Sequence, residues 1–381
     1  MRRVFRQALR STNEVEARLT ARLAREYDAD HVYLFGSGTQ ALQVAVRVAW
    51  QRVGESRVAL PSFTCFDVGA AAVAVGARIL LYDIDPHTLQ PDLDSLSRWV
   101  REGARVVVVT PLYGYPVNWQ AIDDVVTSLG AVAIEDAAQG HGARWRNRPL
   151  GSMGAISVLS FGRGKGWTGG AGGALLLRGN GSARGLESQS VESARKSEEL
   201  RALTFLTAQW VLGRPQVYGL PAAIPWLALG ETVYRDARPP RPITHCAATC
   251  LDAAFAAAIQ EADARRANAA ALLASLHDRS RVQTIQTVPE ASPGFLRLPL
   301  RLCRGLSGFR DPTRAVALGV APSYPSVLGD VPQVRARLEA GGHHAPGGEA
   351  LSRTLFTAPT HSLLSGRERE ELVQLLLEYR T

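Results

Sequence analysis

The sequence predicts an α/β fold, in which helices flank a mostly parallel central sheet and a smaller C-terminal α+β unit follows. Between about residues 30 and 180, short runs rich in β-branched residues alternate with segments whose apolar residues recur every three or four positions. The short runs are bounded by Gly, Pro or Asp. This alternation is typical of parallel strands that are joined by helices.

The same patterns place the individual elements. Strands are expected at 57–61, 78–83, 105–110, 131–135, 155–161 and 175–178. Helices are expected at 12–26, 39–52, 64–75, 92–101 and 119–129. Later in the chain, an Ala-rich pattern predicts a helix at 247–276, and an amphipathic pattern predicts a last helix at 366–379.

A change in composition divides the chain. Residues 182–202 are polar with a helical pattern, residues 203–229 are apolar and interrupted by prolines, and 238–242 (RPPRP) has the composition of a rigid connector. We therefore expect a large domain at 1–245, with an atypical stretch at 181–245, and a smaller domain at 246–381. With 46% apolar and 20% charged residues, the chain can bury a sizeable core.

The basic residues are nearly all arginines. Lys and Arg together number 43 against 35 Asp and Glu, for a net charge of +8, yet the only lysines are Lys165 and Lys196. A chemistry that needs a deprotonatable amine thus has two candidates, because guanidinium stays protonated in proteins. The arginines are dispersed and no nucleic-acid-binding motif is found, so the charge favours small phosphate- or carboxylate-bearing substrates over nucleic acid.

Several features predict a cytoplasmic protein without a metal site. The basic start of the chain lacks the apolar core of a signal peptide, and four cysteines make no disulfide framework in a chain this long. His245, Cys246 and Cys250 are potential metal ligands, but a single cluster fits a helical core better. The apolar residues 203–229 would contact a lipid-linked substrate or membrane, or form a dimer interface or active-site wall, which we favour.

Two segments carry candidate binding groups. The run FGSGT, 35–39, leads directly into a helical pattern, and the free amides of a helix N-terminus can bind phosphate, although such a run is also a common helix cap. The run VAIEDAAQ, 132–139, is a buried strand that ends in acid. A carboxylate at the end of a parallel strand would hold a ring nitrogen protonated, or would cap a helix.

A third segment contains one of the two lysines. Lys165 lies in a glycine-rich loop after the strand at 155–161, whereas Lys196 lies in the polar run SARKSEEL, a solvated helix face. An amine, a carboxylate and a phosphate cradle are together the groups that a pyridoxal phosphate enzyme needs. Pyridoxal 5'-phosphate is therefore the expected cofactor.

At this point the sequence resembles a known family, the DegT/DnrJ/EryC1/StrS sugar aminotransferases, which are fold-type I pyridoxal phosphate enzymes. The matching motifs are SGTxAL at 37–42, PSFT at 61–64, LYGYP at 112–116, EDAAQxHGA at 135–143 and SFxxxK at 160–165. The similarity covers about residues 12–178 and returns more weakly at 265–268 and 358–364.

The resemblance implies roles for the matching residues. Lys165 would bind the cofactor covalently and shuttle a proton, and Asp136 would pair with the pyridine nitrogen. Gln139 would contact the ring's phenolic oxygen. The phosphate would be bound by Ser37, Gly38, Thr39 and Ser160. The family usually has an aromatic residue stacked on the ring where this chain has Cys65, so Phe66 or Phe63 would take that place.

Some positions depart from the family pattern. Ala171 replaces a glutamate of the glycine loop, and no clear counterpart of the family's GxNxR segment, which reaches the partner subunit's cofactor, is found near 231–247. Lys165 argues against the family's dehydratases, which have histidine at this position.

The resemblance implies a homodimer with active sites at the subunit interface. The enzyme would move an amino group, from glutamate, to a nucleotide-linked keto-sugar in aminosugar biosynthesis. The alternatives are an aminotransferase acting on a cyclitol or other secondary-metabolite ketone, and a cofactor-binding regulatory protein without turnover.

Overall fold

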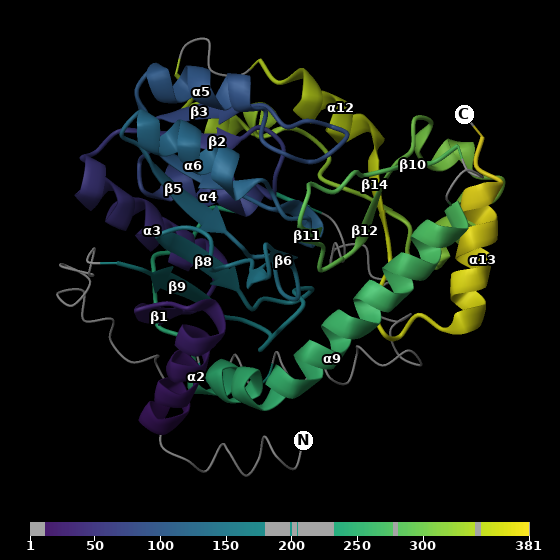
Figure 1. The fold of residues 1–381 in the computed structure, drawn as a ribbon, viewed down its shortest axis with the longest axis horizontal. Helices are drawn as coiled ribbons and strands as arrows, with labels where there is room; N and C mark the ends of the chain where they lie inside the picture. Colours follow the sequence, from purple (N-terminus) through teal and green to yellow (C-terminus); the bar gives the residue numbers. More distant parts are fainter. Residues whose placement is uncertain are drawn as a thin grey trace.

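The structure, a computed structural model, describes residues 12–179, 199, 204, 232–276, 281–339 and 344–380. Its main feature is a seven-stranded sheet with the order β1-β9-β8-β5-β4-β2-β3 (Figure 1). All its strands run parallel except β9, which is antiparallel to both neighbours. The strands are β1 (His31–Phe35), β2 (Arg57–Pro61), β3 (Ile79–Tyr82), β4 (Ala104–Val109), β5 (Val132–Asp136), β8 (Ile156–Ser160) and β9 (Gly173–Leu177). The expected fold class is confirmed.

Helices cover both faces of this sheet. One face packs against α3 (Gly38–Val53) and α4 (Phe66–Ala74), and the other against α2 (Thr12–Tyr27), α5 (Leu93–Arg101) and α6 (Trp119–Ser128). In β4, Val106 and Val108 join the first core and Val107 and Val109 the second. Because successive side chains point to opposite faces and both faces are buried, the strands read as continuous apolar runs.

A long helix, α9 (His245–Leu276), connects the large sheet to the C-terminal strands (Figure 1). Near its start, Asp252 forms ion pairs of 3.1 Å with Arg18 and Arg22 of α2. The C-terminal sheet has the order β10 (Gln283–Thr284), β12 (Leu298–Arg301), β14 (Leu355–Ala358) and β13 (Ala321–Pro322). The helices of this part include α10 (Pro312–Ala317) and α13 (Gly366–Leu377).

Parts of the C-terminal half return to the large sheet. Leu338 forms a parallel bridge with Ile79, and α11 (Pro332–Arg335) packs against α4. The start of α12 (Pro346–Thr354) bonds to Asp83. A small sheet joins β11 (Ala291–Ser292) to β6 (Arg144–Trp145) and β7 (Arg148–Pro149). The domain boundary at residue 245 stays a prediction.

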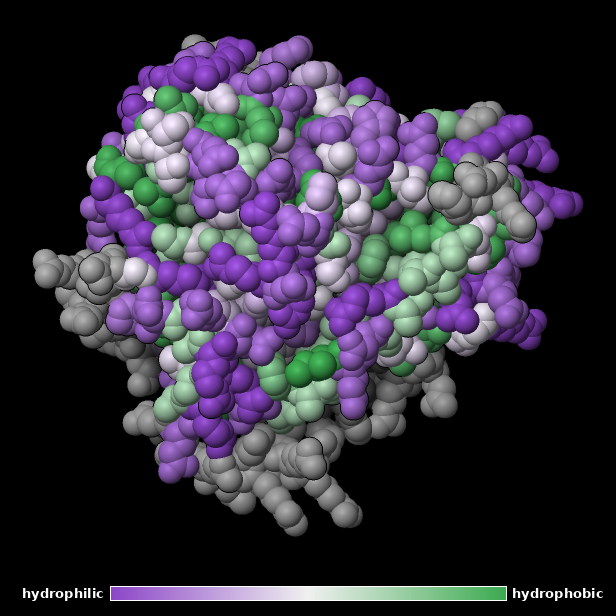
Figure 2. Space-filling view, viewed as in Figure 1, coloured by the Kyte–Doolittle hydropathy of each residue, from purple (hydrophilic) through white to green (hydrophobic). Residues whose placement is uncertain are grey.

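The predicted elements agree with the observed ones within two residues at either end. In the large sheet, β1 was not expected, since its sequence HVYLF leads directly into the run read as a phosphate loop. The short strands β6, β7 and β10 to β14 were not expected individually either. The expected helix at 182–202 and the apolar segment 203–229 lie outside the described residues, apart from residues 199 and 204. Among the described helices, none has the length and apolar character needed to cross a bilayer. On the face of the molecule that is seen in Figure 1, hydrophobic side chains form small groups between hydrophilic ones (Figure 2).

Candidate functional site

Most of the candidate residues meet in one open cavity at the C-terminal edge of the parallel strands. Its empty space, open solvent at the mouth included, is about 430 Å³. Six residues predicted from the sequence line it: Gly38, Thr39, Asp136, Gln139, Ser160 and Lys165. This edge is where ligands bind in parallel α/β sheets, because loops and helix N-termini converge there.

Asp136 ends β5 and is buried. Its carboxylate accepts hydrogen bonds from the Ala138 amide at 3.1 Å and from Thr110 Oγ1 at 3.4 Å. Burial raises the pKa of Asp136, and the charge of Lys165 opposes that shift. A buried carboxylate with few donors attracts a cation strongly, so Asp136 is suited to hold a protonated ring nitrogen.

Lys165 lies in a glycine loop that follows β8. Its amide bonds to the Gly162 carbonyl at 3.3 Å, and Gly164 has a φ of +80°, a conformation that favours glycine. The buried Trp167 anchors the other end of the loop, because its indole N–H donates to the Leu251 carbonyl of α9 at 3.0 Å. The loop thus fixes the backbone that carries the amine.

The start of α3 forms part of the cavity wall. Ser37 caps the helix, its Oγ accepting from the Gln40 amide at 3.2 Å. Gly38 packs so tightly against β8 that an added Cβ would come within 2.6 Å of the Ser160 Cβ. The first amides of a helix have no carbonyl of their own helix to bond, so they can donate to phosphate beside the Ser160 hydroxyl.

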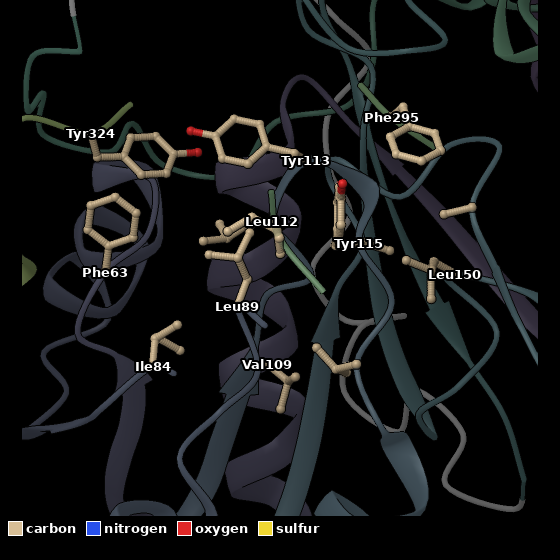
Figure 3. Close-up of a cluster of buried hydrophobic side chains, with 14 of the residues drawn as sticks. Phe63, Ile84, Leu89, Val109, Leu112, Tyr113, Tyr115, Leu150, Phe295 and Tyr324 are labelled. Carbon is tan, nitrogen blue, oxygen red and sulfur yellow. The ribbon is translucent and has the colours of Figure 1, made fainter. Parts of the chain in front are cut away.

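Gln139 is held by two tyrosines. Its Oε1 accepts from the Tyr113 amide at 2.6 Å, and its Nε2 donates to the Tyr324 hydroxyl at 2.7 Å. Figure 3 shows the hydroxyls of Tyr113 and Tyr324 pointing toward one another, with Phe63 beside Tyr324. The amide nitrogen keeps one N–H free to donate to a ring oxygen.

Two predicted contacts are placed elsewhere. Phe66 is packed in the core between α4 and the sheet and does not line the cavity, and Phe63 packs edge-on against Tyr324 at 5.5 Å between ring centroids. Ser37 caps α3 and does not line the cavity either. Cys65 lines the cavity at this point, and the stacking role of Phe66 or Phe63 stays a prediction.

Sequence reasoning missed other lining residues, among them Thr110 and Asp67. Thr110 directly follows β4, so the rule that pointed to Asp136 at a strand end would also have found it. Asp67 had no such signal. In the described part of the chain, no group of three or more His, Cys, Asp or Glu side chains is arranged to hold a metal ion, and the four cysteines are free thiols.

The donor set fits pyridoxal phosphate. The cavity offers an amine (Lys165), a buried carboxylate (Asp136) and a helix start with a serine hydroxyl beside it. The amine matches the aldehyde of the cofactor, the carboxylate matches its pyridine nitrogen, and the helix start with the serine hydroxyl matches its phosphate.

Comparison with known proteins agrees with this geometry. The profile of the DegT/DnrJ/EryC1/StrS aminotransferase family matches residues 2–203. The chain belongs to this family. The family's sequence similarity thus covers the large sheet and every predicted residue of the cavity.

Individual relatives match over shorter stretches. The L-glutamine:2-deoxy-scyllo-inosose aminotransferase of Streptomyces kanamyceticus is 31% identical over 167 residues, 44% of this chain and 39% of that protein. The dTDP-3-amino-3,4,6-trideoxy-alpha-D-glucose transaminase of Streptomyces venezuelae is 33% identical over 147 residues, 38% of each chain. The alignments thus span about two fifths of these relatives' length.

The likeness in fold extends beyond the segment that the family profile matches. The structure of S. venezuelae DesV in complex with a ketimine intermediate superposes with a TM-score of 0.72 at 22% identity, covering 96% of this chain and 88% of that one. The C-terminal half therefore shares the fold of that structure, although the family profile does not reach it.

Proposed function

We propose that the protein is a pyridoxal phosphate-dependent aminotransferase that transfers an amino group to a keto-sugar. One observation carries the proposal: Lys165 and the buried Asp136 line the same cavity as the start of α3. These groups come from separate segments of the chain, and only the fold brings them together. Family membership supports the reaction class.

Different residues of the chain would carry out different parts of the reaction. When bound, pyridoxal phosphate supplies an electron sink for the electrons left on the substrate carbon when its proton departs. Lys165 Nζ would hold the cofactor, then accept that proton and return it. Asp136 would keep the pyridine nitrogen protonated, and its burial strengthens that pairing. Ser160 and the amides of Gly38 and Thr39 would bind the phosphate.

The acceptor has two candidates. A nucleotide-linked keto-sugar agrees with the net charge of +8 and with the S. venezuelae relative that is named for a dTDP-sugar. A cyclitol ketone agrees with the relative named for 2-deoxy-scyllo-inosose. The amino donor would be glutamate, as the family resemblance implies. The alternative donor is glutamine, which appears in the name of the S. kanamyceticus relative. We place the enzyme in the cytoplasm as a homodimer with its sites at the subunit interface.

The decisive experiment uses the chain's two lysines. The protein is loaded with pyridoxal phosphate, treated with borohydride to make the lysine linkage permanent, and digested for mass spectrometry. The label is expected on Lys165, to be lost in Lys165→Ala and kept in Lys196→Ala. A label that persists in Lys165→Ala would refute the proposal.

Turnover is tested separately. Mixing the loaded protein with excess glutamine or glutamate should bleach the visible absorbance of the lysine-bound cofactor in a single turnover. Adding a panel of sugar-nucleotide ketones and cyclitol ketones should then restore it with the true acceptor. Bound cofactor that no donor bleaches would instead identify a regulatory protein.

A further inference from the structure

Asp67 adds a second carboxylate to the wall of the cofactor cavity. It is the second residue of α4, is exposed, and lines the cavity together with Asp136 and Lys165. Burial raises the pKa of the neighbouring Cys65 thiol to about 12, and the charge of Asp67 adds to that rise. It also adds to the raised pKa of Asp136, for which burial is the main cause. Its field therefore acts inside the cavity.

Asp67 has no ion-pair partner among the described residues of this chain. The charged residues of the lining are Asp67, Asp136 and Lys165. With pyridoxal phosphate bound as proposed, Lys165 would be joined to the cofactor and Asp136 would pair with its ring nitrogen, so neither would neutralise Asp67. Across the described segments, no cationic side chain forms an ion pair with Asp67. Within the described part of this chain, the cavity thus presents a negative charge at Asp67 that no ion pair offsets.

We infer that Asp67 is a specificity-determining residue that disfavours a second carboxylate on the substrate. It would select an amino donor whose side chain ends in a neutral amide, as in glutamine, over a dicarboxylic amino acid such as glutamate. This inference rests on the proposed aminotransferase function. The physical reason is like-charge repulsion in a partly enclosed site, where water screens charges less than in bulk.

Two unreactive five-carbon acids test this charge selection without turnover. Glutarate and glutaramate have the same length, and they differ in one end, which is a carboxylate in glutarate and an amide in glutaramate. Calorimetry on the cofactor-loaded protein gives the ratio of their dissociation constants. The wild-type protein should bind glutaramate more tightly. In Asp67→Asn the preference should fall about five- to twentyfold, the size of one like-charge contact at intermediate screening.

A matched control separates the cavity charge from helix stabilisation. Asp94 is also an exposed acid in the first turn of a helix, α5, but it does not line the cavity. Asp94→Asn should leave the ratio as in the wild type, and added salt should reduce the wild-type preference. Asp67→Ser provides a second neutral variant should Asp67→Asn fold poorly.

The possible failures are distinguishable. Equal binding of the two acids by the wild type, or a preference that survives in the neutral variants, would overturn the role of Asp67 while the cofactor absorbance remains. A protein that takes up no pyridoxal phosphate at all would instead overturn the proposed function.

Discussion

Gln139 Nε2 donates a hydrogen bond of 2.7 Å to the hydroxyl of Tyr324, although 185 residues separate them in the sequence. The other end of the same amide accepts from the Tyr113 backbone at 2.6 Å, and Tyr113 has a φ of +55°, which is unusual for a residue with a side chain. The hydroxyl of Tyr113 in turn bonds to Ser323. Gln139 therefore ties the C-terminal half to the loop after β4 and is held at the cavity wall.

Tyr324→Phe should loosen this arrangement. The substitution removes the acceptor of the Gln139 amide, so the side chain can rotate away from the cavity. We expect a fall of severalfold in affinity for pyridoxal phosphate, measured by titration of the cofactor absorbance. The free energy of unfolding should fall by about 1–3 kcal/mol, the cost of a buried donor left without its partner.

Tyr379→Phe is the control for this variant. The Tyr379 hydroxyl accepts from the Arg304 amide at 2.9 Å and donates to the Gly305 carbonyl at 3.2 Å, and Tyr379 does not line the cavity. Its loss should destabilise the fold without changing cofactor affinity. Equal cofactor affinities in the two variants would show that Tyr324 does not position Gln139.

Gly38→Ala should weaken the phosphate site. The new Cβ would come within 2.6 Å of the Ser160 Cβ, so the start of α3 and the end of β8 would separate. Overpacking of this kind costs about 1–3 kcal/mol of stability. We expect cofactor affinity to fall at least about tenfold, since that cost falls on the phosphate contacts themselves.

A second substitution distinguishes steric from chemical effects at this contact. Adding Ser160→Gly to Gly38→Ala removes the atom that clashes, so thermal stability should recover while the hydroxyl contact to phosphate stays lost. If the double variant is no more stable than Gly38→Ala alone, the close approach of these two segments is not what requires glycine.

The sequence predicted the large sheet and half of the cavity wall because both follow local rules. Period-two burial on both faces produces apolar runs such as 106–109, and strand ends and glycine turns mark Asp136 and Lys165. Asp67 and the contact between Gln139 and Tyr324 depend instead on how distant segments pack. The position of Phe66 has the same origin, because the turn into α4 places Cys65, and not Phe66, in the cavity wall.

Stability should fall as the pH is lowered, in part because of His141. Burial lowers the pKa of His141, and the charges of Arg265 and Arg266 act in the same direction. His141 takes up a proton near pH 6.5 in the unfolded chain but only at lower pH in the folded chain. Its contribution to the free energy of unfolding is therefore fully present above pH 6.5 and is lost as the pH falls below that value. The slope is at most about 1.4 kcal/mol per pH unit for each such histidine.

His141→Gln tests this contribution. Chemical denaturation from pH 8 to pH 5 should give a shallower decline for the variant, whereas the two slopes should coincide above about pH 7.5. The pKa of His361 is also lowered, mainly by burial, so His141→Gln combined with His361→Gln should be shallower still. Parallel curves for the wild type and His141→Gln would exclude a role for His141 in the pH dependence.

Gly347→Ala should separate α12 from the large sheet. The amides of Gly347 and Gly348 each donate to the buried carboxylate of Asp83 at 2.8 Å, and a Cβ on Gly347 would overlap the carbonyl oxygen of Ile84. That oxygen belongs to the backbone and cannot rotate away, so we expect a loss of more than about 2 kcal/mol in urea unfolding. Gly366→Ala is the matched control, also at a helix start, where an added Cβ meets nothing within 4 Å and stability should hold or rise. Equal stability of the two variants would mean that the backbone around Ile84 can yield, and that the Asp83 contact does not fix α12 in place.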